Sequence, residues 1–295
     1  MSTLNIAPVT TEDYRRIAEK RLPRALFDYI DGGSFDERTL VKNVEDFQRI
    51  QMKQRVMYDV SSLDTRMRLF DEDWAMPVAL APIGLGGLMA RRAETQAKRV
   101  ADAFGIPMCL STVSVCSMEE VAAVSDKPFW FQLYMLRDRD AVTDLLQRAR
   151  NVGVTTLVFT VDLAVLGARY KDVRNGLAGN PDLWGRLRSG PLSYLTHTRW
   201  TYDVGVRGGP HVFGNLSNYV SNAKTVKDYT AWIHSQHDPS VTWKDIEWLR
   251  TVWDGKLVLK GILSPEDAIS AAHAGADAII VSNHGGRQLD GVSSG

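Results

Sequence analysis

Apolar and polar residues follow one repeated order along much of this chain: an amphipathic stretch, a glycine, a short apolar run and a polar residue. The order recurs in Glu94–Thr112, Asp140–Asp162 and Ser264–Gly286. Apolar residues at helical spacing followed by a compact apolar run are typical of an α-helix that leads into a β-strand. The pattern therefore predicts repeated helix–strand units.

The predicted helices have recognisable ends. Ser264 is expected to cap the helix that begins at Pro265, with Asp267 in its first turn, and Ser117–Glu120 ("SMEE") has the spacing of a capping box. Three glycines stand where a helix would end in a left-handed residue: Gly105, Gly153 and Gly275.

The predicted strands are apolar along nearly their whole length, as expected for a parallel sheet covered on both faces. Polar residues collect at their carboxyl ends, where barrels and open α/β sheets build their sites. The candidates are Val78–Ala81, Met108–Ser111, Phe129–Leu133, Leu157–Val161, Leu257–Lys260 and Ala278–Ser282.

Two fold classes fit this order, since an open doubly wound sheet tolerates six strands and a (β/α)₈ barrel requires eight. No dinucleotide-type glycine motif follows an early strand, and "GLGG" at Gly84–Gly87 has the wrong spacing. We therefore favour a TIM barrel with six of its eight strands, as a single domain spanning residues 1–295. Residues 1–43 would form a helical cap, residues 76–295 the partial barrel, and residues 170–244 an insertion after the fourth strand.

The composition narrows the function classes. The chain carries 35 basic and 35 acidic residues. A net charge of zero argues against a nucleic-acid-binding surface, which needs a basic excess. Cys109 and Cys116 are the only cysteines and lack metal-site spacing, so we expect no metal centre, no disulfide scaffold and a reducing compartment. No secretory signal is recognised at the start, and the longest apolar run, Met76–Ala90, is too short to span a bilayer.

The most informative stretch is "VSNHGGRQLDG", Val281–Gly291, which follows the last predicted strand. The imidazole of His284 suits proton abstraction near neutral pH, and the guanidinium of Arg287 suits a carboxylate. Together they indicate a substrate with both an abstractable proton and a carboxylate. The alternative is a loop histidine beside a surface arginine.

Four further polar residues lie at strand ends. Asp162 could orient an imidazole, or it could be a helix cap. Lys260 ends an apolar strand, where an unpaired lysine is costly unless it reaches solvent. Gln132 and Tyr134 could serve the site or be half-buried structural groups.

Seven sequence motifs, taken in order, resemble the FMN-dependent L-2-hydroxy acid dehydrogenase and oxidase family, and within it bacterial respiratory L-lactate dehydrogenases. The similarity runs from about Thr11 to the last residue, and the last motif is highly specific to the family. The motifs are "LPRALFDYIDGG", "MPVALAPIGLGGL", "LSTVSVCSMEEV", "WFQLYMLRDR", "LVFTVDLAVLGARYKD", "LVLKGILSPEDA" and "VSNHGGRQLDG".

The resemblance implies oxidation of L-lactate to pyruvate with FMN as cofactor. His284 would remove a proton during electron transfer to FMN, and Asp162 would pair with it. The sequence is equally compatible with hydride transfer and with a carbanion route. The implied carboxylate or hydroxyl ligands are Arg287, Arg169, Tyr29 and Tyr134, the last also counted as catalytic.

The resemblance also assigns residues to the flavin. Lys260 would lie by the N1/C2 carbonyl of the ring, where a cation favours the reduced form. Three side chains would hydrogen-bond the ring, and the backbone of Pro82, Ile83 and Gly84 would run along it. Those side chains are Ser111, Gln132 and Thr160.

One residue that differs between branches of the family bears on the electron acceptor. Val113 stands where the oxidase branch carries tryptophan, which favours a dehydrogenase that passes electrons to quinone or another carrier. The resemblance further implies a homo-oligomer on the cytoplasmic side of the bacterial inner membrane, bound peripherally, or otherwise in the cytoplasm.

Family members continue for about another quarter of their length, with the last two strands and the phosphate site. We therefore expect the present chain to be a C-terminally truncated form. Expressed alone, it should expose a strand edge, bind FMN weakly and turn over poorly.

Two alternatives stay open. The chain could act on another L-2-hydroxy acid such as mandelate or glycolate, or it could be an inactive fragment that serves only in binding or assembly. Within the insertion, apolar and basic residues are interleaved in Gly176–Asn215, which suits either a membrane contact or a lid. The residues concerned are Leu183, Trp184, Leu187, Leu192, Tyr194, Leu195 and Trp200, with Arg186, Arg188 and Arg199.

Overall fold

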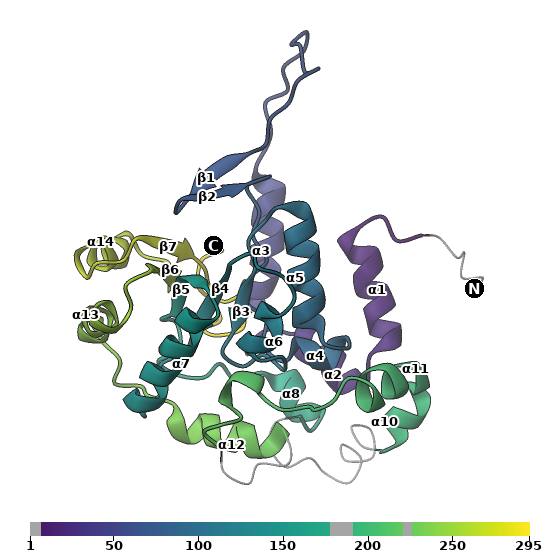
Figure 1. Ribbon diagram of the computed structural model, residues 1–295. Coiled ribbons are helices and arrows are strands. Elements are labelled where there is room, and N and C mark those ends of the chain that lie inside the picture. Colours follow the sequence, from purple (N-terminus) through teal and green to yellow (C-terminus); the bar gives the residue numbers. More distant parts are fainter. Residues whose placement is uncertain (1–6, 178–190, 221–225) are drawn as a thin grey trace.

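The computed structural model in Figure 1 describes residues 7–177, 191–220 and 226–295. The described chain begins with three helices, α1 (Thr11–Arg21), α2 (Arg24–Asp31) and α3 (Arg38–Arg49). The Thr10 side chain accepts a hydrogen bond from the Asp13 N–H, which caps α1. The third helix extends to Arg49, beyond the boundary at residue 43 that was predicted for the helical cap.

A parallel sheet of five strands lies at the centre. Its order is β3-β4-β5-β6-β7, so strands that follow each other in the sequence are neighbours in space. Their bounds are β3 Cys109–Ser111, β4 Phe129–Leu133, β5 Val154–Thr160, β6 Lys256–Ile262 and β7 Ala278–Val281. Among the described residues the sheet stays open, with β3 and β7 at its edges.

Helices cover one face of this sheet, as Figure 1 shows. Strand residues such as Phe131 and Phe159 enter one apolar core with Leu145 and Leu249 of the helices. The covering helices are α5 (Ala93–Phe104), α6 (Met118–Ala122), α7 (Arg139–Asn151), α13 (Trp243–Val252) and α14 (Pro265–His273).

The opposite face of the sheet changes from apolar to polar along the strands. Its apolar level holds Cys109, Trp130, Val158 and Val258 together with Trp74. Side chains alternate between faces along a strand, so the residue two positions further on each strand lies on the same face. Those four residues are Ser111, Gln132, Thr160 and Lys260.

A two-stranded antiparallel hairpin closes the apolar level at the amino ends of the strands. It consists of β1 (Met67–Leu69) and β2 (Glu72–Trp74). The Glu72 carboxylate accepts hydrogen bonds from Trp130 Nε1 at 3.2 Å and from Thr155 Oγ1 at 2.6 Å. The hairpin thus leaves only the carboxyl ends of the strands open for a site.

Five of the six predicted strands are confirmed, with bounds that differ by up to three residues. The sixth, Val78–Ala81, is wrong as a strand. Only Leu80 pairs, in a single bridge to Met108. Pro77 and Pro82 flank this segment, and a proline has no N–H to donate to a ladder.

The predicted helix ends are confirmed. Ser264 Oγ accepts a hydrogen bond from the Asp267 N–H, and Ser117 and Glu120 form the expected capping box. The three glycines after the helices have positive φ, at 64° for Gly105, 79° for Gly153 and 90° for Gly275.

The insertion is largely helical where the structure describes it. After α8 (Tyr170–Arg174) come α10 (Pro191–Thr196), α11 (Thr198–Trp200), a π-helical turn η1 (Thr201–Val206), a 3₁₀ turn η2 (Gly214–Leu216) and α12 (Val226–Gln236). The short helix α4 (Gly86–Met89) lies near η1. Leu183, Trp184, Arg186, Leu187 and Arg188 lie outside the described residues, as do the side chains of Leu192 and Tyr194.

Trp200 is a correction to the predicted membrane-facing set. Its side chain is only 7% exposed and packs with Leu22, Phe27 and Val204. Its Nε1 donates to the Leu88 carbonyl at 2.8 Å. This tryptophan therefore fixes the insertion to the N-terminal helices. Leu195 of the same set is exposed.

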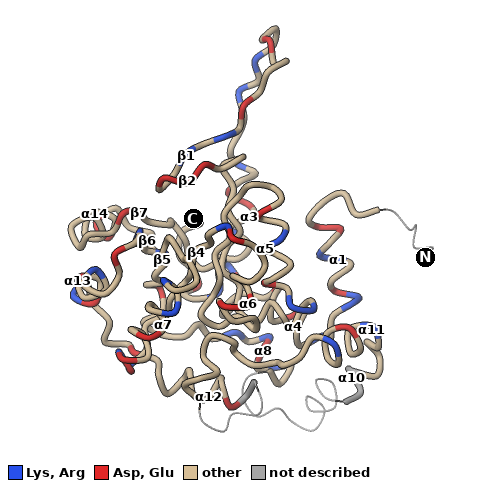
Figure 2. The backbone as a smooth tube through the Cα atoms, in the orientation of Figure 1, with Lys and Arg blue, Asp and Glu red and all other residues tan. Residues whose placement is uncertain are grey.

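Charges of both signs are interspersed along the backbone in Figure 2. A long extended segment between α3 and β1 projects from the body in Figure 1. It exposes Met52 and Met57 almost fully. Among the helices that the structure describes, none combines the length and apolar character needed to cross a membrane.

Candidate active site

His284 and Asp162 lie together beyond the carboxyl ends of β7 and β5. His284 Nδ1 is 2.8 Å from Asp162 Oδ1, although the two residues are 122 positions apart. An Nδ1–H that donates to this carboxylate leaves the lone pair on Nε2. The imidazole is thus held in the form that can accept a proton.

The environment of Asp162 restrains its carboxylate. Oδ2 is buried and has no hydrogen-bond partner in the described part of the chain. Gly261 lies directly against the side chain, since a β-carbon there would be 2.7 Å from Asp162 Cβ and Cγ. Sequence analysis missed Gly261, although its position directly after the polar strand end Lys260 was a usable signal.

Two arginines meet at the ring of Tyr29, which lies on α2. The guanidinium carbons of Arg169 and Arg287 are 4.9 Å and 5.1 Å from the centre of that ring. Arg287 also donates a hydrogen bond to the Gly32 carbonyl. Burial and the neighbouring charge of Arg169 lower the pKa of Arg287. Three predicted substrate ligands are therefore in one place.

Tyr134 belongs to the same cluster. Burial, with the nearby Tyr29 and Asp162, raises the pKa of its phenol, while Arg169 and Arg287 act in the opposite direction. The phenol therefore stays protonated at neutral pH and can donate a hydrogen bond.

The loop that carries His284 and Arg287 is fastened to the N-terminal helices. The Ser34 N–H donates to the Gly286 carbonyl at 2.9 Å, and the Thr39 N–H donates to Asp290 Oδ1 at 2.8 Å. Asn43 and Asn283 exchange side-chain hydrogen bonds at 3.0 and 2.6 Å. The predicted cap therefore holds one wall of the site.

A row of polar side chains crosses the sheet beside this cluster. Ser111 Oγ donates to Gln132 Oε1 at 3.0 Å, and Gln132 Nε2 donates to Thr160 Oγ1 at 2.9 Å. Lys260 follows, because it pairs with Thr160 in the β5–β6 register. The sequence prediction named all four residues, and the structure brings them together.

Lys260 is half-buried and has no ion-pair partner within 4.0 Å among the described residues. Burial lowers the pKa of its ammonium group, while Asp162 and Cys109 act in the opposite direction. A partly desolvated cation without a counterion is costly unless a ligand supplies acceptor atoms.

The segment Pro82–Gly84 borders the row of polar side chains. A β-carbon on Gly84 would lie 2.8 Å from Val113 Cγ2 and 3.7 Å from the Tyr29 hydroxyl. The N–H groups of Ile83 and Gly84 have no protein acceptor in the described residues. Open backbone donors, the polar row and an unpaired lysine fit a planar ring with several polar atoms, as the isoalloxazine of FMN has.

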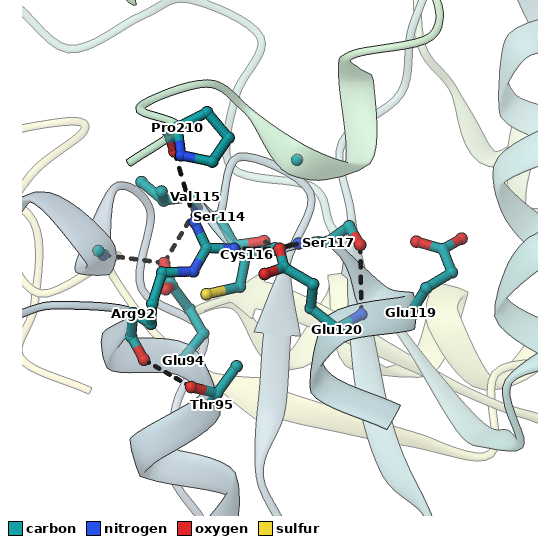
Figure 3. A network of polar contacts seen from close by, with 12 residues as sticks. Arg92, Glu94, Thr95, Ser114, Val115, Cys116, Ser117, Glu119, Glu120 and Pro210 are labelled. Atoms are coloured by element: carbon teal, nitrogen blue, oxygen red, sulfur yellow. Dashed lines mark hydrogen bonds and ion pairs between the residues drawn. The ribbon is translucent and has the colours of Figure 1, made fainter. Parts of the chain in front are cut away.

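Glu94, which sequence analysis missed, connects the segment that follows Gly84 to the segment that follows Val113 (Figure 3). Its Oε1 accepts hydrogen bonds from the N–H groups of Gly87 and Val115, both at 3.0 Å. Glu94 is only 5% exposed. Glu94 lies in the first turn of α5, where an acidic residue is common, so nothing in the sequence pattern marked it as a site residue.

Comparisons with known proteins agree with this geometry. The profile of the family described as FMN-dependent dehydrogenase matches residues 18–295. An L-lactate dehydrogenase of Pseudomonas aeruginosa (strain LESB58) is 54% identical over 282 residues, which are 96% of this chain and 73% of that protein. An L-lactate dehydrogenase of Acinetobacter baylyi is 52% identical over 285 residues, 97% of this chain and 73% of the relative.

Comparison with solved structures supports the same family. A monotopic membrane protein, (S)-mandelate dehydrogenase, matches with a TM-score of 0.87 at 36% identity, over 96% of this chain and 74% of the other. A mandelate oxidase matches with a TM-score of 0.78 at 36% identity, over 97% of this chain and 72% of the other. These matches confirm the predicted fold class, in which the five-stranded sheet is part of a TIM barrel. The chain belongs to the FMN-dependent dehydrogenase family.

Proposed function

We propose that this chain, with FMN bound, oxidises L-lactate to pyruvate. The observation that carries the proposal is the pairing of His284 with Asp162 at 2.8 Å beside a cluster of two arginines. A proton acceptor next to a carboxylate-binding pair suits a 2-hydroxy acid. The relatives that are 52–54% identical are named L-lactate dehydrogenase, which favours lactate within that class.

Each residue of the cluster has a definite task in this proposal. Arg169 and Arg287 bind the substrate carboxylate, because a guanidinium matches its planar geometry. Tyr29 and Tyr134 donate hydrogen bonds to the carboxylate or the hydroxyl. Substrate bound in this way is fixed relative to His284.

His284 removes a proton through Nε2, and Asp162 stabilises the resulting imidazolium ion. Bound FMN would supply the acceptor for the two electrons that the oxidation of the substrate α-carbon releases. The backbone of Pro82, Ile83 and Gly84 would lie along its ring. Its polar atoms would be held by Ser111, Gln132, Thr160 and Lys260.

An anaerobic titration tests this function. The FMN-loaded protein is mixed with L-lactate in the absence of oxygen, and we expect the visible flavin absorbance to bleach while pyruvate appears in equal amount. D-lactate is the control and should leave the spectrum unchanged. Bleaching by mandelate or glycolate but not by L-lactate would favour the other substrates. A spectrum that no 2-hydroxy acid changes would favour a fragment that serves only in binding or assembly.

We further propose quinone as the electron acceptor and a peripheral position on the cytoplasmic face of the inner membrane. Val113, at a position where oxidases carry tryptophan, and the match to a monotopic membrane protein support this. Co-sedimentation with anionic liposomes and reduction of a soluble quinone analogue test the two parts separately. A protein that stays in the supernatant would exclude the membrane part.

We also propose that the chain forms a homo-oligomer. The exposed Met52 and Met57 on the projecting segment support association, since monomers seldom leave such apolar surface uncovered. Light scattering on the purified protein measures the mass, and the mass of one chain at all concentrations would exclude the oligomer.

A further inference from the structure

Arg169 has a carboxylate partner that lies behind the substrate-binding cluster. Its Nε is 2.8 Å from Asp172 Oδ2, in the first turn of α8. Neither Nη group of Arg169 has a protein acceptor among the described residues. The arginine is therefore held from its Nε side, and its two terminal nitrogens stay available.

Two guanidinium groups near one tyrosine ring also need a counter charge. Arg169 and Arg287 both contact Tyr29, and each acts on the other as a like charge. Asp172 interacts electrostatically with both arginines. Without it, the repulsion between them would favour conformations in which the two arginines separate.

The burial of Asp172 distinguishes this ion pair from a surface one. An exposed pair three residues apart on a helix contributes little to stability. Asp172 is only 3% exposed, and its Oδ1 is buried without a hydrogen-bond partner among the described residues. Burial raises the pKa of this carboxyl even beside Arg169, so the ionised form is costly to the fold. Because the buried charge of Asp172 does not favour folding, its presence at this position calls for a functional explanation.

We propose that Asp172 is a positioning residue for the substrate carboxylate: it fixes Arg169 through Nε and keeps Arg169 and Arg287 together when no substrate is bound. The proposal rests on the proposed function, because it takes these two arginines as the carboxylate ligands. The atoms that bind substrate belong to the arginines, and Asp172 acts only through them.

The neighbouring ion pair on α8 provides a contrast. Lys171 Nζ is 2.9 Å from Glu37 Oε2 and connects the same helix to the segment before α3. This pair is more exposed, and among the described residues neither of its side chains has a hydrogen bond or ion pair to Tyr29, Arg169 or Arg287. If α8 only needed to be anchored, the two pairs would serve equally. They can therefore be separated by experiment.

The test is Asp172→Asn in the FMN-loaded full chain. We expect KM for L-lactate to rise about tenfold with kcat changed less than about threefold, because ground-state and transition-state binding weaken together. Affinity for pyruvate, measured by calorimetry, should fall by a similar factor, while affinity for the neutral analogue lactamide should not change. A melting temperature within about 2 °C of wild type is expected, because asparagine removes the cost of a buried charge.

Two further variants keep the test decisive. Asp172→Glu retains the charge and should restore at least half of the lost pyruvate affinity. Lys171→Gln is the matched control on the same helix and should leave KM and pyruvate affinity unchanged. If Asp172→Asn does not fold, the comparison of Asp172→Glu with Lys171→Gln still applies.

The outcomes separate this inference from the proposed function. If L-lactate does not reduce the flavin but pyruvate binds and Asp172→Asn weakens it, the function fails and the positioning role stands. Unchanged pyruvate affinity in Asp172→Asn would overturn the positioning role and leave the function intact. Equal losses in Asp172→Asn and Lys171→Gln, or an equal loss for lactamide, would reduce Asp172 to an anchor of α8.

Discussion

Gly261 lies so close to Asp162 that a β-carbon on the glycine would come within 2.7 Å of the aspartate Cβ and Cγ. The glycine also has a φ of +114°, a backbone conformation that other residues rarely adopt. The position of the carboxylate that orients His284 therefore depends on a missing side chain on the neighbouring strand β6.

Replacement of this glycine should damage activity and stability together. In Gly261→Ala, the new methyl group must displace Asp162, which pulls the carboxylate away from His284 Nδ1. We expect a fall in kcat of tenfold or more and a loss of roughly 1–3 kcal/mol in unfolding free energy from backbone strain. Steady-state kinetics and urea unfolding measure the two effects.

Gly153→Ala is the matched control. Gly153 also has a positive φ, of 79°, but a β-carbon there would meet nothing within 4 Å. This variant should lose about 1 kcal/mol of stability and keep its activity. If both variants had the same kcat, contact with Asp162 would not be the cause.

The pairing of His284 with Asp162 predicts a non-additive effect of mutation. His284→Gln removes the proton acceptor, and Asp162→Asn removes the group that fixes its tautomer. Each should lower kcat by roughly 10²–10⁴-fold while the flavin spectrum is retained. Because the two side chains act as one unit, the double variant should be no slower than His284→Gln alone.

Stopped-flow reduction by L-lactate measures this cycle without interference from reoxidation. Losses that multiply in the double variant would mean that the two residues act independently. The position of Asp162 behind the imidazole would then be a packing feature.

The polar row of the site could be predicted from the sequence for a simple reason. Strand ends in a parallel sheet meet at one edge, and the polar residue of each strand follows the apolar level by two positions, as Thr160 follows Val158 and Lys260 follows Val258. Apolar runs that end in a polar residue therefore located both the strands and the site. The family-specific motif around His284 likewise identified the catalytic pair, His284 and Asp162.

Other features depended on contacts that the linear pattern does not contain. The β1–β2 hairpin turns at Phe70 and Asp71, whose φ values of 50° and 66° are of the kind usually supplied by Asn-Gly. Trp200 is an exposed-looking aromatic beside Arg199, but the N-terminal helices cover it. Asp172 has an ordinary helix-start position, and only its burial reveals another role.

Lys260 should lower the stability of the protein without FMN while it supports the bound form. Burial lowers the pKa of its ammonium group from the ordinary value of 10.5. We expect Lys260→Met to unfold at a higher temperature than wild type when both lack FMN. The same variant should bind FMN less tightly and be reduced by lactate about tenfold more slowly or worse, because the cation facing the ring is lost.

The pH dependence of this stability difference has a definite sign. Between its lowered folded pKa and its unfolded pKa, this lysine binds fewer protons in the folded state than in the unfolded state, so its cost grows as pH falls from about 10.5 towards the folded pKa. The advantage of Lys260→Met should therefore be complete below the folded pKa and should vanish above about 10.5. An advantage that persists unchanged in alkali would come from packing rather than charge. Thermal unfolding of both proteins across this range measures it.

Glu94 should stabilise the flavin-facing segments through its backbone contacts rather than through its charge. Its Oε1 accepts from the Gly87 and Val115 N–H groups, which directly follow the segments of Gly84 and Val113 (Figure 3). Glu94→Ala would leave two buried donors unpaired, so we expect a loss of roughly 2–4 kcal/mol in unfolding free energy. FMN affinity should fall on the order of tenfold, because both segments can then shift.

Glu94→Gln keeps an acceptor oxygen in place and should retain most of both the stability and the FMN affinity. If Glu94→Gln lost as much FMN affinity as Glu94→Ala, the negative charge would matter and the contacts to the backbone would not suffice.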